Sequence, residues 1–189
     1  MFVFLFLTVC LALLTGCKLT RAGYETAAYS VVEKQGQFEI RDYPPMLLAT
    51  TRMPNRNPMQ GDSFRHLFRY ISGDNARQQK IAMTTPVFIS NQDPKQMSFV
   101  LPSSMAGQGA PEAVGKQVVL KETEGGLFAT YRFSGNWSAE RIEKASHTLE
   151  KWIEEKNFHP NGPPQYAFFD PPFTPGFLKR NEVLIRLAE

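Results

Sequence analysis

Two aromatic and two basic side chains share one short stretch of predicted helix. Phe64 and Phe68 are four residues apart, as are Arg65 and Arg69, so each pair follows one line along a helix surface. Such a surface suits a flat apolar ligand with anionic groups, because aromatic rings hold its body and fixed cations hold its carboxylates. The alternative is an amphipathic helix with its rings in the core and its arginines in water, and the spacing alone favours it.

The sequence contains no convincing catalytic machinery. It has no G-x-S-x-G elbow, glycine-rich phosphate loop or Walker motif. Asp42 and Glu122 could form a carboxylate pair, although surface pairing with the adjacent Arg41 and Lys121 is the simpler interpretation. No two histidines have a metal-ligand spacing; the three are His66, His147 and His159. We therefore expect a protein that is not an enzyme and holds no structural metal.

Composition excludes several classes of protein. The 189 residues carry 21 Lys and Arg against 18 Asp and Glu, and a net charge of +3 is too small to suggest a nucleic-acid-binding domain. The only cysteines are Cys10 and Cys17. The chain after Cys17 therefore contains no disulfide scaffold, zinc ribbon or cysteine nucleophile.

The N-terminal residues resemble the signal of a bacterial lipoprotein. Residues 1–14 are apolar except for Thr8, a run that is short for a membrane span and typical of a signal-peptide core. The following Leu14-Thr15-Gly16-Cys17 resembles a lipobox, in which the cysteine is acylated and becomes the first mature residue. The alternative is an ordinary secretory signal with a chance cysteine.

These features predict where the mature chain resides. We expect residues 1–16 to be removed as a signal peptide, Cys17 to anchor the protein in a membrane, and residues 17–23 to form a short tether. Lys18, rather than Asp, follows the cysteine. If the source is Gram-negative, this resembles the sorting pattern for the periplasmic face of the outer membrane.

An internal repeat runs through the rest of the chain. Leu48–Met53 and Phe128–Phe133, which are 80 residues apart, share Ala, Thr and Arg in the same positions. At the same offset upstream, Ile40–Asp42 and Leu120–Glu122 share an apolar, basic and acidic order. The alternative explanation is chance similarity between two short strands.

A helical pattern and two β-prone runs follow each copy. Apolar residues recur at helical spacing over residues 64–71 and 142–153. The expected helix caps are Asp62 or Ser63 with Gly73 for the first helix, and Ser138 for the second. The expected strands that follow are residues 87–89 and 98–101, then 166–169 and 183–187.

These elements predict an α+β fold. A duplicated βαββ-type unit would form a distorted antiparallel β-barrel or sheet, with two main helices packed outside. We expect one domain over residues 24–189, with pseudo-symmetric halves at about 24–102 and 116–189.

Six short strings occur in a recognisable order: Phe38–Tyr43 (FEIRDY), Tyr70–Asn75 (YISGDN), Lys80–Val87 (KIAMTTPV), Phe133–Gly135 (FSG), Tyr166–Pro172 (YAFFDPP) and Arg180–Val183 (RNEV). Together they resemble the SOUL haem-binding protein family over about residues 24–187. The resemblance implies the duplicated fold described above, which is shared with gyrase-inhibitor-like domains that bind small molecules. It also implies non-covalent binding of haem or another tetrapyrrole.

The resemblance implies a pocket along the first helix. A second basic position of the family is Thr174 here, and the histidine proposed as iron ligand in one eukaryotic branch is Asp42 here. The implied haem binding therefore lacks these two partners and is expected to be weak. The implied binding residues are Phe64, Leu67, Phe68 and Arg69, with Arg65 beside them.

Three functions follow from these observations. The leading one is an envelope lipoprotein that binds haem or a related porphyrin reversibly. The second is a gyrase-inhibitor-like pocket for another amphiphilic small molecule, which would be expected to have Asp42 and Glu122 facing it. The third is an envelope protein-interaction module whose pocket is vestigial and filled by Phe and Met side chains.

Overall fold

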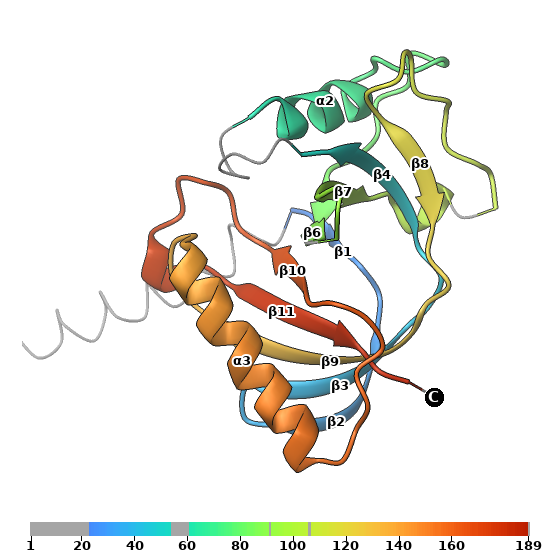
Figure 1. The fold of residues 1–189 in the computed structure, drawn as a ribbon. Helices are drawn as coiled ribbons and strands as arrows, with labels where there is room; N and C mark the ends of the chain where they lie inside the picture. Colours follow the sequence, from blue (N-terminus) through green and yellow to red (C-terminus); the bar gives the residue numbers. More distant parts are fainter. Residues whose placement is uncertain (1–22, 54–60, 91, 106, 189) are drawn as a thin grey trace, which may run out of the picture.

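The computed structural model describes residues 23–53, 61–90, 92–105 and 107–188. Residues 1–22, including the predicted lipid anchor Cys17, lie outside the described residues. Two α-helices and eleven strands make up the described part (Figure 1). The helices are α2 (Asp62–Ile71) and α3 (Ala139–Glu155), and the strands are β1 (Glu25–Thr26), β2 (Ser30–Gln35), β3 (Phe38–Tyr43), β4 (Leu47–Arg52), β5 (Thr84–Thr85), β6 (Val87–Ser90), β7 (Gln96–Val100), β8 (Val119–Glu122), β9 (Gly126–Phe133), β10 (Gln165–Phe168) and β11 (Asn181–Arg186).

Nine of the strands form one antiparallel sheet. Their order is β2-β3-β9-β11-β10-β6-β7-β4-β8, and β1 and β5 form a separate parallel pair. The α+β prediction is confirmed. Of the two forms predicted, the open sheet is correct, because β2 and β8 are the ends of the order and do not pair to close a barrel among the described strands.

The sheet reproduces the repeat that the sequence shows. Its order is symmetric about the β6–β10 pair if β3, β4, β6 and β7 correspond to β8, β9, β10 and β11. Ala49 of β4 lies opposite Leu120 of β8, and Ala129 of β9 lies opposite Ile40 of β3. The two pairs are equivalent, because Ala49 and Ala129 are 80 residues apart, as are Ile40 and Leu120. Each half thus lends the first strand of its repeated unit, β3 or β8, to the other half, which ties the two halves into one sheet.

Both helices cover the same face of the sheet. Helix α2 packs on β4 and β7, and α3 packs on the equivalent strands β9 and β11 (Figure 1). Their apolar stripes enter one core through residues that are almost completely buried, including Leu67 and Tyr70 of α2 and Leu149 and Ile153 of α3. A smaller cluster lies on the other face; its members include Ala27, Tyr43, Phe88, Ala167 and Leu184.

The helix caps agree only in part with the sequence. Ser138 caps α3 as predicted, since its side chain accepts a hydrogen bond from the Arg141 amide. The prediction of Asp62 or Ser63 as the cap of α2 was wrong. Gly61 holds that position without a side-chain bond, while the Ser63 hydroxyl donates instead to the carbonyl of Arg52 in β4. The tertiary contact therefore outcompetes local capping.

The carboxylate pair that the sequence left as an alternative does not form. Asp42 is on β3 and Glu122 on β8, two strands near opposite ends of the sheet, and both side chains are exposed. The exchange of first strands between halves carries them away from the pseudo-axis rather than towards it. Arg41, which was expected to pair with Asp42 at the surface, is not a surface residue. It is 2% exposed and bonded to the fully buried Glu182.

Candidate functional site

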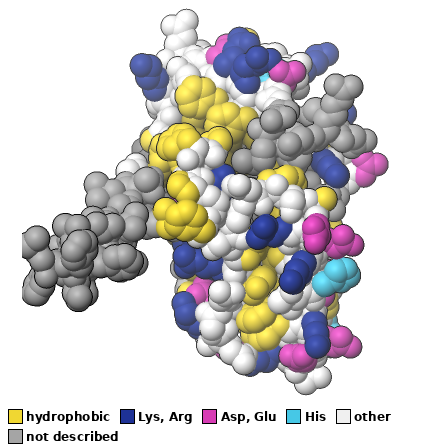
Figure 2. All heavy atoms as spheres, turned by 90° about the vertical axis from the view of Figure 1, so that its left-hand side faces the viewer, with side chains coloured by type: hydrophobic (Ala, Val, Ile, Leu, Met, Phe, Trp, Pro, Cys, Tyr) yellow, Lys and Arg dark blue, Asp and Glu magenta, His cyan; other side chains and the backbone are white. Residues whose placement is uncertain are grey.

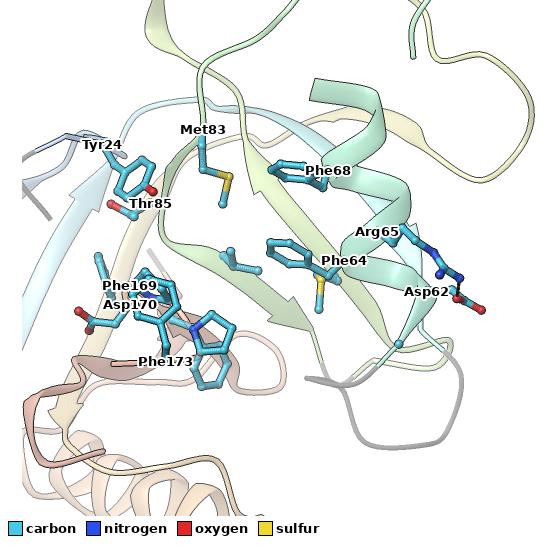
Figure 3. Close-up of a pocket in the computed structure, with 16 residues that line it drawn as sticks. Tyr24, Asp62, Phe64, Arg65, Phe68, Met83, Thr85, Phe169, Asp170 and Phe173 are labelled. Carbon is cyan, nitrogen blue, oxygen red and sulfur yellow. Dashed lines mark hydrogen bonds and ion pairs between the residues drawn. The ribbon is translucent and has the colours of Figure 1, made fainter. Parts of the chain in front are cut away.

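A cavity of about 660 Å³ lies on the helix-covered face, between α2 and the chain that leaves β10 (Figure 3). Its volume is in the range of about 300–1,000 Å³ that is typical of small-molecule sites. Apolar side chains from both halves of the molecule line it. They include Phe64 and Phe68 of α2, Met83, Val87 and Met97 from the first half, and Phe168, Phe169 and Phe173 from the second.

One wall of the cavity is a pair of aromatic rings on α2. The Phe64 and Phe68 rings have centroids 6.0 Å apart and planes inclined by only 13°. Phe99 packs against Phe64 in an edge-to-face arrangement, with centroids 5.3 Å apart. Phe64 is 41% exposed and Phe68 is 50% exposed. Helical spacing thus produces a stacked pair of aromatic rings that is open to a ligand.

The opposite wall comes from the string after β10. Phe169, Asp170 and Phe173 line the cavity on this side, together with Tyr24 from the start of the described chain (Figure 3). The guanidinium of Arg180 lies over the Phe169 ring, 4.0 Å from its centroid, and stabilises its position. The Asp170 carboxylate accepts a hydrogen bond from the Arg180 amide at 2.6 Å, which fixes the turn.

The basic residues of α2 are already paired with acidic neighbours. Arg65 contributes to the cavity lining, but its guanidinium turns away from the rings and forms an ion pair with Asp62 (Figure 3). Arg69 does not line the cavity in the described residues and pairs with Asp74 at 2.7 Å. Both arginines are well exposed, so exchange of these partners for a ligand carboxylate costs little.

The structure brings together three of the five binding residues that the sequence predicts. Phe64, Phe68 and Arg65 reach the cavity. Leu67 is completely buried in the core under α2, and Arg69 faces solvent beside Asp74. Neither of these two lines the described cavity, because their positions on the helix turn them away from it.

The remaining lining residues were not predicted as parts of one site, although many of them belong to the strings that carry the family resemblance. Met83, Thr85 and Val87 come from KIAMTTPV, and Phe168 to Pro172 come from YAFFDPP. The signal was therefore present as two separate strings. Only the fold shows that they face the same cavity.

The other candidate groups take no part in this cavity. His66, His147 and His159 are absent from its lining, and the described residues contain no group of three or more His, Cys, Asp or Glu side chains placed to hold a metal ion. Glu122 borders a different cavity of about 380 Å³ on the opposite face of the sheet, while Asp42 does not border it. Among the described residues, no helix is long and apolar enough to cross a membrane.

Residues 24–186 match the family model described as "SOUL heme-binding protein", which covers most of the chain. The chain belongs to the SOUL family. This match includes both walls of the cavity and the strings that carried the resemblance. SOUL proteins form a binding-protein family, so binding of haem or another small molecule is the activity that membership supports. No curated protein sequence matches the chain significantly.

Solved structures share the fold of this SOUL domain at very low sequence identity. The C-terminal domain of EcmrR has 12% identity and a TM-score of 0.55, with 81% of this chain and 98% of that chain covered. An uncharacterised conserved protein from Listeria innocua has 10% identity and a TM-score of 0.57, with 80% and 92% covered. A protein described as a hydrolase from Listeria innocua has 8% identity and a TM-score of 0.55, with 83% and 94% covered. At these identities the likeness concerns the fold alone.

Proposed function

We propose that this SOUL protein is a lipid-anchored protein of the cell envelope that binds haem or a related tetrapyrrole reversibly in the cavity beside α2. The observation that carries the proposal is the geometry of Phe64 and Phe68. Two nearly parallel, stacked and half-exposed rings on one side of a cavity of about 660 Å³ make an aromatic wall for an apolar ligand.

The chemistry of the cavity fits a tetrapyrrole. Its lining is dominated by aromatic and aliphatic side chains, which suit the ring system, and Arg65 stands at its edge for a propionate. The sulfur atoms of Met83 and Met97 and the hydroxyl of Tyr24 are the soft and phenolic groups that could meet an iron. Haem would supply redox and ligand-binding chemistry, and the chain's own residues would bind and orient it.

The lining also favours reversible binding over enzymatic turnover. The described residues that border the cavity include neither a histidine nor a lysine, and their only carboxylates are Asp62 and Asp170. Asp62 is paired with Arg65, and Asp170 accepts a bond from a backbone amide. Both are thus engaged in holding the walls, which supports a role as carrier, buffer or scavenger rather than as an enzyme.

The lipid anchor rests on the sequence. Acylation of Cys17 would hold the protein at a membrane, and two or three acyl chains anchor stably where one does not. Growth of cells in labelled palmitate tests this part. We expect label in the wild-type chain and none in Cys17→Ser, which should also accumulate as an unprocessed precursor. Equal labelling of both chains contradicts the anchor.

The two alternatives fit the structure less well. A gyrase-inhibitor-like site was expected to have Asp42 and Glu122 facing one pocket, and these residues are far apart on the sheet and exposed. A vestigial pocket was expected to be filled by Phe and Met side chains, whereas those side chains line an open cavity.

Titration of the full chain in lipid nanodiscs tests the ligand class, with empty nanodiscs as the blank. Hemin and a metal-free porphyrin should both give saturable absorbance changes at micromolar concentrations, since packing and a propionate contact need no iron. Binding of neither compound contradicts the proposal. Binding of hemin alone would show that an iron ligand, and not the apolar wall, determines recognition.

A further inference from the structure

Two phenylalanines on one loop are far more exposed than apolar side chains normally are. Phe173 is 83% exposed and Phe177 is 76% exposed, both in the segment between β10 and β11. This segment is folded and not extended, because the Thr174 amide donates to the carbonyl of Pro171 and the Lys179 ammonium donates to that of Pro172 at 3.1 Å. A compact loop with two bare rings and a lysine resembles the aromatic and basic anchors found at membrane surfaces.

The loop is continuous with the mouth of the cavity. Phe173 lines the cavity together with Tyr24, Phe64 and Phe68, all of which are partly exposed (Figure 3). Figure 2 shows hydrophobic side chains gathered on this side of the molecule, in contrast to the charged surface around them. The cavity therefore opens within an apolar face and not beside it.

The predicted anchor point is close to this face in the sequence. Tyr24, which lines the cavity, is seven residues after Cys17. A fully extended chain of that length spans about 25 Å at most. A compact domain of this size is roughly 40 Å across. The tether is thus too short to let the domain turn its opposite side to the membrane.

The charge of the tether agrees with a membrane surface. Residues 17–23 contain Lys18 and Arg21 and no acidic residue. Lys179 adds a cation beside the exposed rings. Basic side chains next to an inserted aromatic group favour anionic lipid headgroups.

We infer that the face formed by Tyr24, Phe64, Phe68, Phe173 and Phe177 lies against the lipid bilayer, with the rings of Phe173 and Phe177 in the headgroup region. The inference rests on the lipid anchor of the proposed function. In this orientation the cavity opens towards the bilayer, where an amphiphilic ligand is dissolved. The ligand then passes between lipid and cavity without crossing water.

Depth-dependent quenching tests the orientation in the full chain. An acylated Cys17 is not a free thiol and Cys10 is removed with the signal, so one introduced cysteine is the single labelling site. We would label Phe177→Cys with a fluorophore in vesicles of phosphatidylethanolamine and phosphatidylglycerol that contain doxyl-labelled lipid. The matched control is Glu155→Cys, at the far end of α3, a helix of 17 residues and thus about 25 Å long.

Strong quenching at position 177 and little at position 155 is the expected result. Equal quenching at both positions, or stronger quenching at 155, overturns the orientation. So does a chain that fails to stay with the vesicles, because the tether argument then has no anchor. Absence of lipid quenching at position 177, together with contact between the labels of two copies, also overturns the orientation. It would assign the exposed rings to self-association.

A transfer assay tests the consequence separately from ligand binding. Phe177 does not line the described cavity, so Phe177→Ser should keep the hemin affinity of the wild type in nanodiscs. Its rate of hemin uptake from donor vesicles should fall several-fold, since docking on the bilayer is weakened. An unchanged uptake rate overturns the direct route. Absence of hemin binding by the wild-type chain would instead contradict the proposed function. The quenching result would still report the orientation of the domain.

Discussion

Arg41 and Glu182, 141 residues apart in the chain, form a two-point ion pair inside the protein. The Arg41 Nη1 atom lies 2.6 Å from Glu182 Oε2, and its Nη2 atom lies 3.1 Å from Oε1. Burial alone lowers the pKa of Arg41, and the Glu182 carboxylate outweighs burial and raises it. Arg180 donates to the same carboxylate, so two arginines share one buried charge, and Arg41 also pairs with Glu39 at 2.8 Å.

Loss of that charge should destabilise the fold strongly. Glu182→Gln removes the buried counter-charge that Arg41 and Arg180 share and leaves Arg41 with its second partner Glu39. Removal of one partner of a buried pair costs about 3–5 kcal/mol. Urea unfolding measures this as a lower midpoint. The matched control is Glu155→Gln, whose carboxylate is well exposed beside Lys151; a change below about 0.5 kcal/mol is expected there. Similar effects of the two changes would contradict the role of the buried pair.

Gly125 is required at the turn between β8 and β9. Its φ is +73°, and an added Cβ would lie 2.4 Å from the carbonyl oxygen of Tyr43. Gly36 also has a positive φ, of +61°, but nothing lies within 4 Å of its Cβ position. Gly125→Ala should therefore cost about 2–4 kcal/mol of stability, against about 1 kcal/mol for Gly36→Ala. Thermal unfolding decides, and equal costs would show that only backbone strain matters.

Two phenols should resist ionisation at high pH. Burial raises the pKa of Tyr43 to about 12, although Arg41 opposes the shift, and burial likewise raises the pKa of Tyr70 to about 12. In the unfolded chain these groups lose their protons near pH 10, so the free energy of unfolding should fall as pH rises above 10. Phenolate absorbance should show a late step that shrinks in Tyr70→Phe. A titration complete in one step near pH 10 contradicts this.

The ion pair between Asp62 and Arg65 should limit the affinity for an anionic ligand. Asp62→Asn frees Arg65 for a propionate and should tighten hemin binding by a few-fold, since an exposed pair contributes about 0–1 kcal/mol. Arg65→Gln should weaken binding by a similar factor. Arg69→Gln is the matched control, because Arg69 pairs with Asp74 outside the described cavity. A larger effect at Arg69 than at Arg65 would place the propionates elsewhere.

Much of the fold could be predicted from the sequence because the duplication leaves its register visible. The offset that relates Ala49 to Ala129 also relates Ile40 to Leu120, and the sheet pairs these residues accordingly. The exchange of first strands between the halves was not predictable. No local signal distinguishes pairing within a half from pairing across halves, which is why a carboxylate pair of Asp42 and Glu122 was left open as an alternative to surface pairing.

The candidate site was predictable only on its helical side. The i, i+4 spacing of Phe64 and Phe68 is a local pattern, and the two rings line one side of the cavity. The choice between Arg65 and Arg69 depends on where Asp62 and Asp74 lie, which is a tertiary fact. The opposite wall around Phe169 comes from a segment about 100 residues later in the sequence. Sequence spacing carries no information on whether two such distant segments are close in space.

The hemin affinity of Phe68→Ala tests the central claim most directly. Phe177→Ala is the matched control, because it removes an exposed ring of the same type outside the described cavity. Loss of a Phe ring from the wall should weaken hemin binding in nanodiscs about tenfold, since burial of such a ring contributes about 1.5–3 kcal/mol when complete. Phe177→Ala should bind as the wild type does. Wild-type affinity in Phe68→Ala would contradict a site beside α2.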